Sequence, residues 1–347
     1  MSEQRKAVAL ISGGLDSMLA AKVIQAQGIH VEGLNFFTGF CVEGHTHAIR
    51  TQHRTKPKRN NALWVAEQLG IKLHIIDVVE EYKDIVLNPK HGYGAYLNPC
   101  LDCKIFMVKK AKEWMEEHDF DFIITGEVVG QRPKSQRKFT MPFIAERSGA
   151  EDKLLRPLCA KNLPLTLPEQ EGWVDRELLH DFSGRSRKPQ INLAAEFKID
   201  EYSQPAGGCC FLTDPNYSDK LKDLWQNRGD KDYELDDIML LKVGRHLRPH
   251  NDFKIIIARE EGECKFMEGY AYRFTCLKPL SHTGPLALID GKADAEGLEL
   301  AARLLTRFGG GKEAEKVSVE IALTSGSVHT LEVKPFAEDE IPKEWYL

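Results

Sequence analysis

The first half of the chain alternates short apolar runs with segments in which apolar residues recur at helical spacing. The short runs predict buried strands over 7–11, 31–37, 73–78 and 120–125. The periodic segments predict helices over 16–25, 61–69 and 103–117. Strands that alternate with helices of this length predict an α/β fold, a doubly wound parallel sheet with helices on both faces. Ligands of such a sheet bind at the carboxyl ends of its strands.

The pattern weakens in the middle of the chain and changes in the last third. Between 157 and 204 Pro, Lys and Arg are frequent, which predicts loops around a single helix at 172–182. The charged stretch 227–237 is our predicted boundary between a first domain, 1–230, and a second, 231–347. The second domain is expected to be a small α+β domain, with strands over 238–243, 254–258, 286–289 and 317–323 and a helix over 293–308.

The composition limits the class of protein. The chain has 347 residues, of which 42% are hydrophobic and 29% charged, as in an ordinary soluble protein of about two domains. No run approaches the ~18 apolar residues of a membrane span, and the N-terminus lacks the layout of a signal peptide. We therefore expect a cytoplasmic protein with no membrane partner. In such a protein, eight cysteines favour metal or redox chemistry over a disulfide framework.

The net charge of −5 gives no whole-protein signal of nucleic-acid binding. Basic residues nevertheless gather in three runs, 50–59, 132–138 and 184–188. Any one run is typical of a solvated loop, but three of them in one predicted domain favour a surface for a phosphate backbone. The residues expected to contact RNA or nucleotide phosphates are Lys134, Arg137, Arg185 and Arg187.

A glycine loop, SGGLDS at 12–17, lies between the first predicted strand and the first predicted helix. Its two glycines let the backbone turn tightly and let a phosphate approach main-chain N–H groups. The N-terminus of the following helix favours negative charge in the same place. Asp16 is unfavourable beside a phosphate unless a divalent cation lies between them. The loop lacks the Gly-Lys-Ser/Thr ending of a Walker loop, so another type of phosphate loop is indicated.

The sextet SGGLDS resembles the PP-loop of ATP pyrophosphatases, which cleave ATP between the α and β phosphates and transfer AMP to an oxygen. This resemblance implies ATP and Mg²⁺ as cofactors, with Asp16 as a catalytic residue that holds the magnesium ion. The nucleotide-binding residues that it implies are Ser12, Gly13, Gly14, Asp16, Ser17, Phe37, Gly126 and Gln131.

Other segments resemble tRNA thiolation enzymes over about the first two thirds of the chain. The segments TGEVVGQRPKSQ at 125–136 and LRPL at 155–158 are similar to parts of the tRNA 4-thiouridine synthetases. The segment NPCLDC at 98–103 resembles the catalytic cysteine region of the tRNA 2-thiouridylases, and GGCCF at 207–211 would supply a partner cysteine. These resemblances imply that a uridine oxygen of tRNA is adenylated and then replaced by sulfur. The sulfur donor would be sulfide or a cysteine desulfurase.

The C-terminal segment LLKVGRHLRPHND at 240–252 has a fainter resemblance to the RNA-binding module of NFACT-type proteins. The chain also departs from the thiolation families. It has no evident RNA-binding extension at the N-terminus and no rhodanese-like sulfur carrier, and its later cysteine is doubled. The missing carrier favours an iron–sulfur cluster on cysteines that takes sulfide from outside the chain.

Four cysteines are candidates for the sulfur chemistry. Cys100 and Cys103 begin a predicted helix, whose N-terminus is expected to lower a thiol pKa and favour the thiolate. Three alternatives are open: structural zinc on four thiols, exchange between persulfide and disulfide on two, and a [4Fe–4S] cluster on three. Because the side chains of adjacent cysteines diverge, the pair Cys209 and Cys210 favours three ligands. We expect Cys100, Cys103 and Cys209 to meet beside the nucleotide, with Cys210 turned toward the core.

The remaining cysteines, Cys41, Cys159, Cys264 and Cys276, are expected to be core or surface thiols. Two other functions compete with thiolation: ATP-dependent amide or amidine synthesis on a small molecule, and nucleotide sensing by an RNA-binding protein with a degenerate site. The first leaves the cysteines unexplained, and the intact loop with Asp16 argues against the second. The sequence leaves open whether the uridine oxygen is on C2 or C4 and whether the protein forms a homodimer.

Overall fold

The computed structural model describes residues 4–42, 60–203 and 209–347. The chain divides into an N-terminal unit that ends at Cys210 and a C-terminal unit that runs from Phe211 to Leu347 and includes Val42. This division lies some way before the expected boundary at 230/231. Helix α9 (Pro215–Arg228) belongs to the C-terminal unit, because its Tyr217 hydroxyl donates a hydrogen bond to the Ile238 carbonyl at 2.9 Å.

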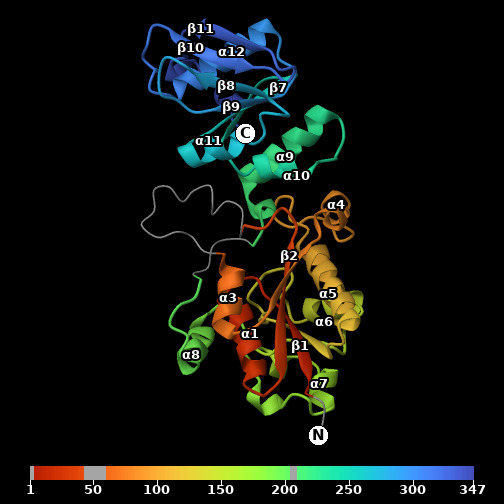
Figure 1. Ribbon diagram of the computed structural model, residues 1–347. Coiled ribbons are helices and arrows are strands. Elements are labelled where there is room, and N and C mark those ends of the chain that lie inside the picture. The colour runs from red at the N-terminus through yellow and green to blue at the C-terminus, as the bar shows by residue number, and fades with distance from the viewer. Residues whose placement is uncertain (1–3, 43–59, 204–208) are drawn as a thin grey trace. The chain divides into compact units, whose positions relative to one another are not determined.

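The N-terminal unit is built on five parallel strands. They are β1 (Lys6–Leu10), β2 (His30–Phe37), β3 (Leu73–Asp77), β4 (Phe122–Thr125) and β5 (Leu154–Leu155). The helices around them are α1 (Leu15–Gln25), α3 (Asn61–Leu69), α4 (Val79–Leu87), α5 (Cys100–Glu117), α6 (Thr140–Arg147), α7 (Leu167–Gln170) and α8 (Lys188–Glu196). The strand order is β3-β2-β1-β4-β5, and Figure 1 shows α1, α3 and α8 on one side of the sheet and α5 and α6 on the other. The doubly wound α/β prediction is confirmed, and the order reverses beside β1, where ligands of such sheets bind.

One predicted helix of this unit is wrong. The range 172–182 contains only a single 3₁₀ turn at Arg176–Leu178, which the Asp175 side chain caps. Gly172 has a φ of +64°, a left-handed conformation that ends rather than starts a helix. The helix of this region is instead α8, and its overlooked signal is Pro189 in the first turn, where a proline costs no hydrogen bond.

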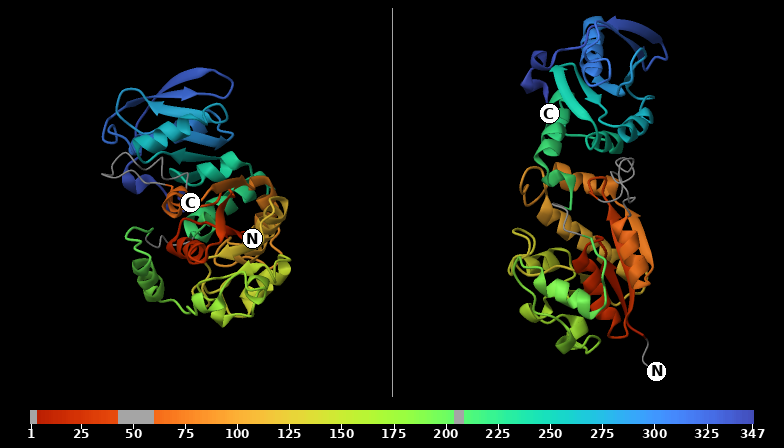
Figure 2. Two further views of the ribbon diagram at one scale, coloured as in Figure 1. Left: turned by 60° about the horizontal axis from the view of Figure 1, so that its bottom comes forward. Right: turned by 90° about the vertical axis from the view of Figure 1, so that its left-hand side faces the viewer.

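The C-terminal unit is built on a six-stranded antiparallel sheet of order β11-β10-β8-β9-β7-β6. The strands are β6 (Arg245–His250), β7 (Phe253–Ile257), β8 (Thr275–Pro279), β9 (Ala287–Gly291), β10 (Val317–Ala322) and β11 (Val328–Val333). Its other helices are α10 (Leu235–Leu240), α11 (Glu261–Glu268) and α12 (Ala295–Arg307). Alternate residues of β7 enter two cores: Ile255 packs on the side of α12, and Ile256 packs with Met267 of α11. Figure 2 shows the strands and helices of this unit, in teal and blue, in two further views.

The predicted strand over 238–243 is wrong. The first half of that range is the end of α10, and the second half is the turn that follows this helix. Glu234 and Asp237 form a reciprocal capping box at the start of α10, a helix signal that outweighs the apolar run after it. The other predicted strands and the helix of this domain are confirmed within a few residues. None of the described helices is long and apolar enough to cross a membrane.

Candidate nucleotide and thiol site

The glycine loop joins β1 to α1, and Gly14 is the last residue before that helix. The Ser17 hydroxyl donates to the Gly14 carbonyl at 2.8 Å and lies 3.5 Å from Ser12 Oγ. Gly13 has a φ of +81°, and a Cβ there would lie 2.8 Å from the Ala62 nitrogen in the first turn of α3. Two helices therefore begin at this loop, and the partial positive charge at both N-termini favours a bound anion.

Gly126 directly follows β4 and packs against the first turn of α1. A Cβ at Gly126 would lie 2.3 Å from the Asp16 carbonyl carbon and 2.4 Å from the Ser17 nitrogen, so only glycine fits without moving the helix. The contact follows from the sheet, because β1 and β4 are paired neighbours. Phe37 ends β2 opposite Asp77 of β3, which places it at the same carboxyl edge.

The Asp16 carboxylate is incompletely hydrogen-bonded. Its Oδ1 atom is buried and has no hydrogen-bond partner among the described residues. Burial raises the pKa of Asp16 above its ordinary value, and the nearby groups of Arg187, Arg132, Gln131 and Gln190 oppose that rise. A buried oxygen without a partner is costly, and a bound cation would remove that cost. The residues therefore fit a magnesium ion held by Asp16 together with phosphate oxygens.

Gln190, on α8, is the residue of this site that the sequence did not reveal. Its side chain is fully buried, and neither amide atom has a hydrogen-bond partner in the part of the chain that the structure describes. The Gln190 side chain faces Asp16 and lowers that carboxyl's pKa by side-chain hydrogen bonding, but the contact does not have the geometry to satisfy either amide atom. Buried amides are nearly always paired in proteins, so this one is free to bind a ligand group. No motif marks it in the sequence, because α8 reaches the loop from more than 170 positions away.

A buried ion-pair group lies directly after Gly126. Glu127 is 3% exposed, with Oε2 at 3.3 Å from Arg156 Nε and Oε1 at 3.7 Å from Lys104 Nζ. Burial alone would raise the pKa of Glu127, but Lys104 and Arg156 outweigh burial and lower it. The ion pair between Glu127 and Arg156 therefore links the segment TGE at 125–127 to the segment LRPL at 155–158. This link gives both segments a structural role at the edge of the sheet.

Two of the basic runs meet beside the loop. Val129 and Ser183 form a parallel bridge, and the Gly184 nitrogen donates to the Val129 carbonyl at 2.7 Å. This pairing brings Arg187, at the start of α8, near Asp16, where its positive charge lowers the carboxyl's pKa. Arg187, expected as an RNA contact, therefore lies at the candidate nucleotide site.

The other expected RNA contacts are exposed. Lys134 donates to the Tyr93 carbonyl at 3.2 Å, and the Arg137 guanidinium donates to the Pro133 carbonyl. Arg185 is exposed in the loop before α8. Their role in RNA binding stays a prediction, and the basic run 50–59 lies outside the described residues.

The candidate thiols come from α5 and from the end of the N-terminal unit. Cys100 and Cys103 lie in the first turn of α5, and Cys209 is exposed, with its Sγ accepting a hydrogen bond from Arg132 at 3.4 Å. Burial raises the pKa of Cys103 to about 12; a hydrogen bond from Tyr82 opposes this rise, and Cys209 and Cys100 add to it. The expectation that the helix N-terminus makes Cys103 a thiolate is therefore wrong, because desolvation outweighs the helix.

The described thiols do not fit the expected [4Fe–4S] cluster on Cys100, Cys103 and Cys209. Across residues 4–42, 60–203 and 209–347, no group of three or more His, Cys, Asp or Glu side chains is arranged to hold a metal ion. The three thiols lie near enough to influence one another electrostatically. They face different partners, however, since Cys103 bonds Tyr82 and Cys209 bonds Arg132.

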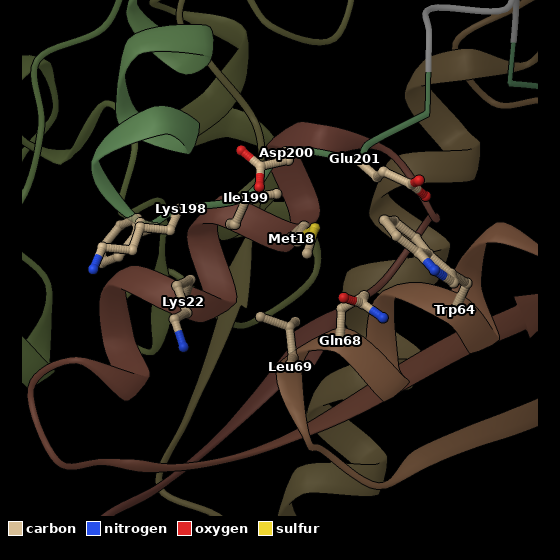
Figure 3. Close-up of a pocket in the computed structure, with 10 residues that line it drawn as sticks. Met18, Lys22, Trp64, Gln68, Leu69, Lys198, Ile199, Asp200 and Glu201 are labelled. Atoms are coloured by element: carbon tan, nitrogen blue, oxygen red, sulfur yellow. The ribbon is translucent and has the colours of Figure 1, made fainter.

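A cavity of about 440 Å³ opens elsewhere on the N-terminal unit. Figure 3 shows Met18 and Lys22 of α1, Trp64 and Gln68 of α3, and the segment after α8 around it. None of the residues expected to bind nucleotide or sulfur lines this cavity. The candidate site is therefore the open loop edge rather than this hollow.

Comparison with known proteins gives separate matches for the N-terminal and the C-terminal parts of the chain. Residues 5–148 match the tRNA methyl transferase HUP domain, and residues 244–346 match the NFACT protein RNA binding domain. The tRNA-specific 2-thiouridylase MnmA of Aliivibrio fischeri is 27% identical over 232 residues, which cover 63% of this chain and 58% of that protein. The N-terminal part of the chain is thus similar to domains of tRNA-modifying enzymes, and the C-terminal part is similar to an NFACT RNA-binding domain.

Other relatives show the same partial coverage. The MnmA protein of Malacoplasma penetrans is 24% identical over 254 residues, 70% of this chain and 65% of that protein. That of Cytophaga hutchinsonii is 29% identical over 147 residues, 40% of this chain and 38% of that protein. The chain thus spans about half the length of these curated relatives. Among solved structures, a 4-thiouridine synthetase in complex with RNA and ATP aligns with a TM-score of 0.36 and 20% identity, covering 69% of this chain and 52% of that one.

Proposed function

We propose that this protein is an ATP-dependent tRNA sulfurtransferase, which adenylates a uridine oxygen of tRNA and replaces it with sulfur. The observation that carries the proposal is the loop edge itself. There, among the described residues, a buried carboxylate oxygen of Asp16 and the buried amide of Gln190 lack well-formed hydrogen bonds, beside Arg187, Arg132 and a group of thiols. The names of the relatives support tRNA thiolation as the reaction.

The adenylation half of the reaction is assigned to the glycine loop. The two helix N-termini bind the phosphates of ATP, and Asp16 would hold the magnesium ion, which neutralises phosphate charge when bound. The uridine oxygen attacks the α phosphate and pyrophosphate leaves, so the uridine must first leave the base stack. Arg132 and Arg187 lie near Asp16, where their positive charges stabilise the negative charge that develops.

The sulfur half of the reaction is assigned to thiol chemistry. A cysteine that carries a persulfide attacks the adenylated carbon through its terminal sulfur, and AMP leaves with the former uridine oxygen. A second thiol then attacks the cysteine sulfur, which leaves the transferred sulfur on the uridine and joins the two cysteines in a disulfide. A dithiol reductant restores both thiols with two electrons and two protons. The sulfane sulfur itself comes from sulfide-derived polysulfide or a cysteine desulfurase.

The C-terminal unit is proposed to bind tRNA, as the match to an NFACT RNA-binding domain suggests. The basic segment around β6 is a poor candidate for the contact surface, however. His246 is 1% exposed, Arg248 pairs with Asp223, and the Arg245 guanidinium lies 4.9 Å from the ring centre of Phe308. The tRNA contacts must then come from other residues of this unit.

The test is pyrophosphate release by the full chain with ATP, with and without bulk tRNA, followed by mass spectrometry of the tRNA nucleosides. Release that depends on tRNA, together with a thiolated uridine when polysulfide is added, is the expected result. The position of the sulfur on C2 or C4 is read from the same spectra. Pyrophosphate release without tRNA would indicate a small-molecule ligase, and RNA binding without release would indicate a nucleotide-dependent RNA-binding protein.

A further inference from the structure

Cys41, which the sequence places outside any motif, lies opposite Cys210 at the edge of the N-terminal unit. The two residues form an antiparallel β-bridge. Cys41 follows β2, and its Sγ lies 3.3 Å from Thr38 Oγ1 and 3.6 Å from the Phe36 carbonyl oxygen. Both cysteines are half-buried. Their pairing joins the end of β2 to the last residue of the unit.

The bridge geometry suits a disulfide. Directly opposed residues of an antiparallel pair have their Cα atoms about 4.5–5.5 Å apart, and disulfides span Cα separations of about 4.4–6.8 Å. Both thiols also lie near one hydroxyl, since Cys210 and Cys41 each raise the pKa of Tyr82 electrostatically. The two sulfurs therefore share a neighbourhood as well as a backbone register.

We propose that Cys41 is the thiol that resolves a persulfide on Cys210, and that the two residues form a disulfide in each catalytic cycle. The catalytic role rests on the proposed function, whereas the pairing rests on the bridge alone. Cys103 is less suited to this attack, because its desolvated thiol stays protonated at neutral pH and is held by Tyr82.

The step is balanced without an outside oxidant. After sulfur transfer, the uridine carbon is joined through the new sulfur to Cys210 Sγ. The Cys41 sulfur, having lost its proton to water, attacks Cys210 Sγ. The bond between that atom and the transferred sulfur breaks, and its electron pair stays on the uridine sulfur. A dithiol then reduces the bond between Cys41 and Cys210.

The pairing is tested first without ATP or tRNA. The full chain is treated with diamide, a diazene that accepts two electrons and two protons from two thiols, and is then alkylated after denaturation and mapped under non-reducing conditions. Wild type, Cys209→Ser and the control Cys264→Ser, whose residue belongs to the C-terminal unit, should each give a linked peptide pair that contains residues 41 and 210. Cys41→Ser and Cys210→Ser should lose it. A Cys210 peptide linked to Cys100 or Cys103 in the wild type, or no linked peptide, would overturn the pairing.

The catalytic role is tested with ATP, tRNA and polysulfide. Cys41→Ser, and Cys41→Ala in case the serine perturbs the fold, should accumulate a protein–tRNA adduct that dithiothreitol cleaves, seen on denaturing gels. Cys103→Ser should not. An adduct in Cys103→Ser and none in the Cys41 variants would assign resolution to Cys103 instead. If wild type yields no thiolated uridine at all, the proposed function fails, while the diamide result still decides the pairing.

Discussion

Two groups of buried polar side chains, one in each unit, differ in how their charges are balanced. In the C-terminal unit, Asp223 accepts hydrogen bonds from Arg248 at 2.8 Å and from Asn227 at 3.0 Å. Lys254, 1% exposed, lies 3.3 Å from Asp290 and 3.8 Å from Asp223. In the N-terminal unit, by contrast, the Asp16 Oδ1 atom has no partner among the described residues.

The difference separates a structural network from a binding site. Burial lowers the pKa of Lys254, and Asp290 and Asp223 act against that shift, so the protein itself supplies the counter-charge. At Asp16 burial raises the pKa, and the two arginines and two amides nearby do not reverse the shift. A buried group that the chain leaves unpaired lowers stability, which is typical of residues kept for ligands.

The largest expected effect is on catalysis by Asp16→Asn. Because the carboxylate is proposed to hold the metal at the phosphates, tRNA-dependent pyrophosphate release should fall roughly 10²–10³-fold, as for loss of one preorganised electrostatic contact. Thermal stability should stay unchanged or rise. The exposed carboxylate of Asp219 serves as the control, and Asp219→Asn should keep full activity. If Asp16→Asn released pyrophosphate at the wild-type rate, the glycine loop would have no part in the proposed reaction.

The opposite outcome is expected for Asp223→Ala. This change removes the carboxylate that Arg248 and the buried Lys254 share and leaves Lys254 with Asp290 alone. The free energy of unfolding of the C-terminal unit should therefore fall by about 3 kcal/mol. Urea unfolding of the full chain, followed by a probe in this unit, measures the loss. Asp219→Ala on the same helix breaks only an exposed pair with Lys222 and should cost about 0–1 kcal/mol. Equal losses in the two variants would mean that the network is not structural.

Gln190→Leu tests the difference between the structural network and the binding site at a residue that carries no charge. Removing an unpaired amide should leave stability unchanged or increase it, while ATP affinity falls about tenfold, or about 1.4 kcal/mol. Isothermal titration of ATP and a thermal melt measure the two effects. Ile191→Ala, at the exposed next position of α8, is the matched control and should change neither. A clear loss of stability in Gln190→Leu, with unchanged ATP affinity, would make Gln190 a packing residue.

The smallest expected effect is on the pH dependence of stability. Because the folded pKa of Asp16 is raised, the folded state binds this proton more tightly than the unfolded state. That stabilisation is present at low pH and is lost as the pH rises from about 4, the ordinary value, through the raised pKa. The melting temperature of wild type relative to Asp16→Asn should therefore decrease over that interval. A difference that stays constant with pH would contradict the raised pKa.

Local signals predicted much of the N-terminal unit. The predicted strands and helices before residue 126 lie within a few residues of the observed ones, although α4 was not predicted. Apolar periodicity and glycine stops act over a few neighbours, which is why these predictions are confirmed. Local signals also misled. The range 172–182 lacks a helix, and 238–243 is not a strand, since caps and left-handed glycines outweighed apolar runs. The expected thiolate at Cys103 failed for a tertiary reason, the burial of its sulfur.

The sequence by itself determined the glycine loop and the sheet that positions it, because a phosphate loop needs residues adjacent in the chain. Only the tertiary structure decided what surrounds Asp16 and the thiols. Gln190 and Arg187 come from α8, and Cys41 meets Cys210 across 168 intervening residues. Burial, unpaired atoms and bridge register depend on contacts between distant segments, and no spacing along the chain encodes them directly.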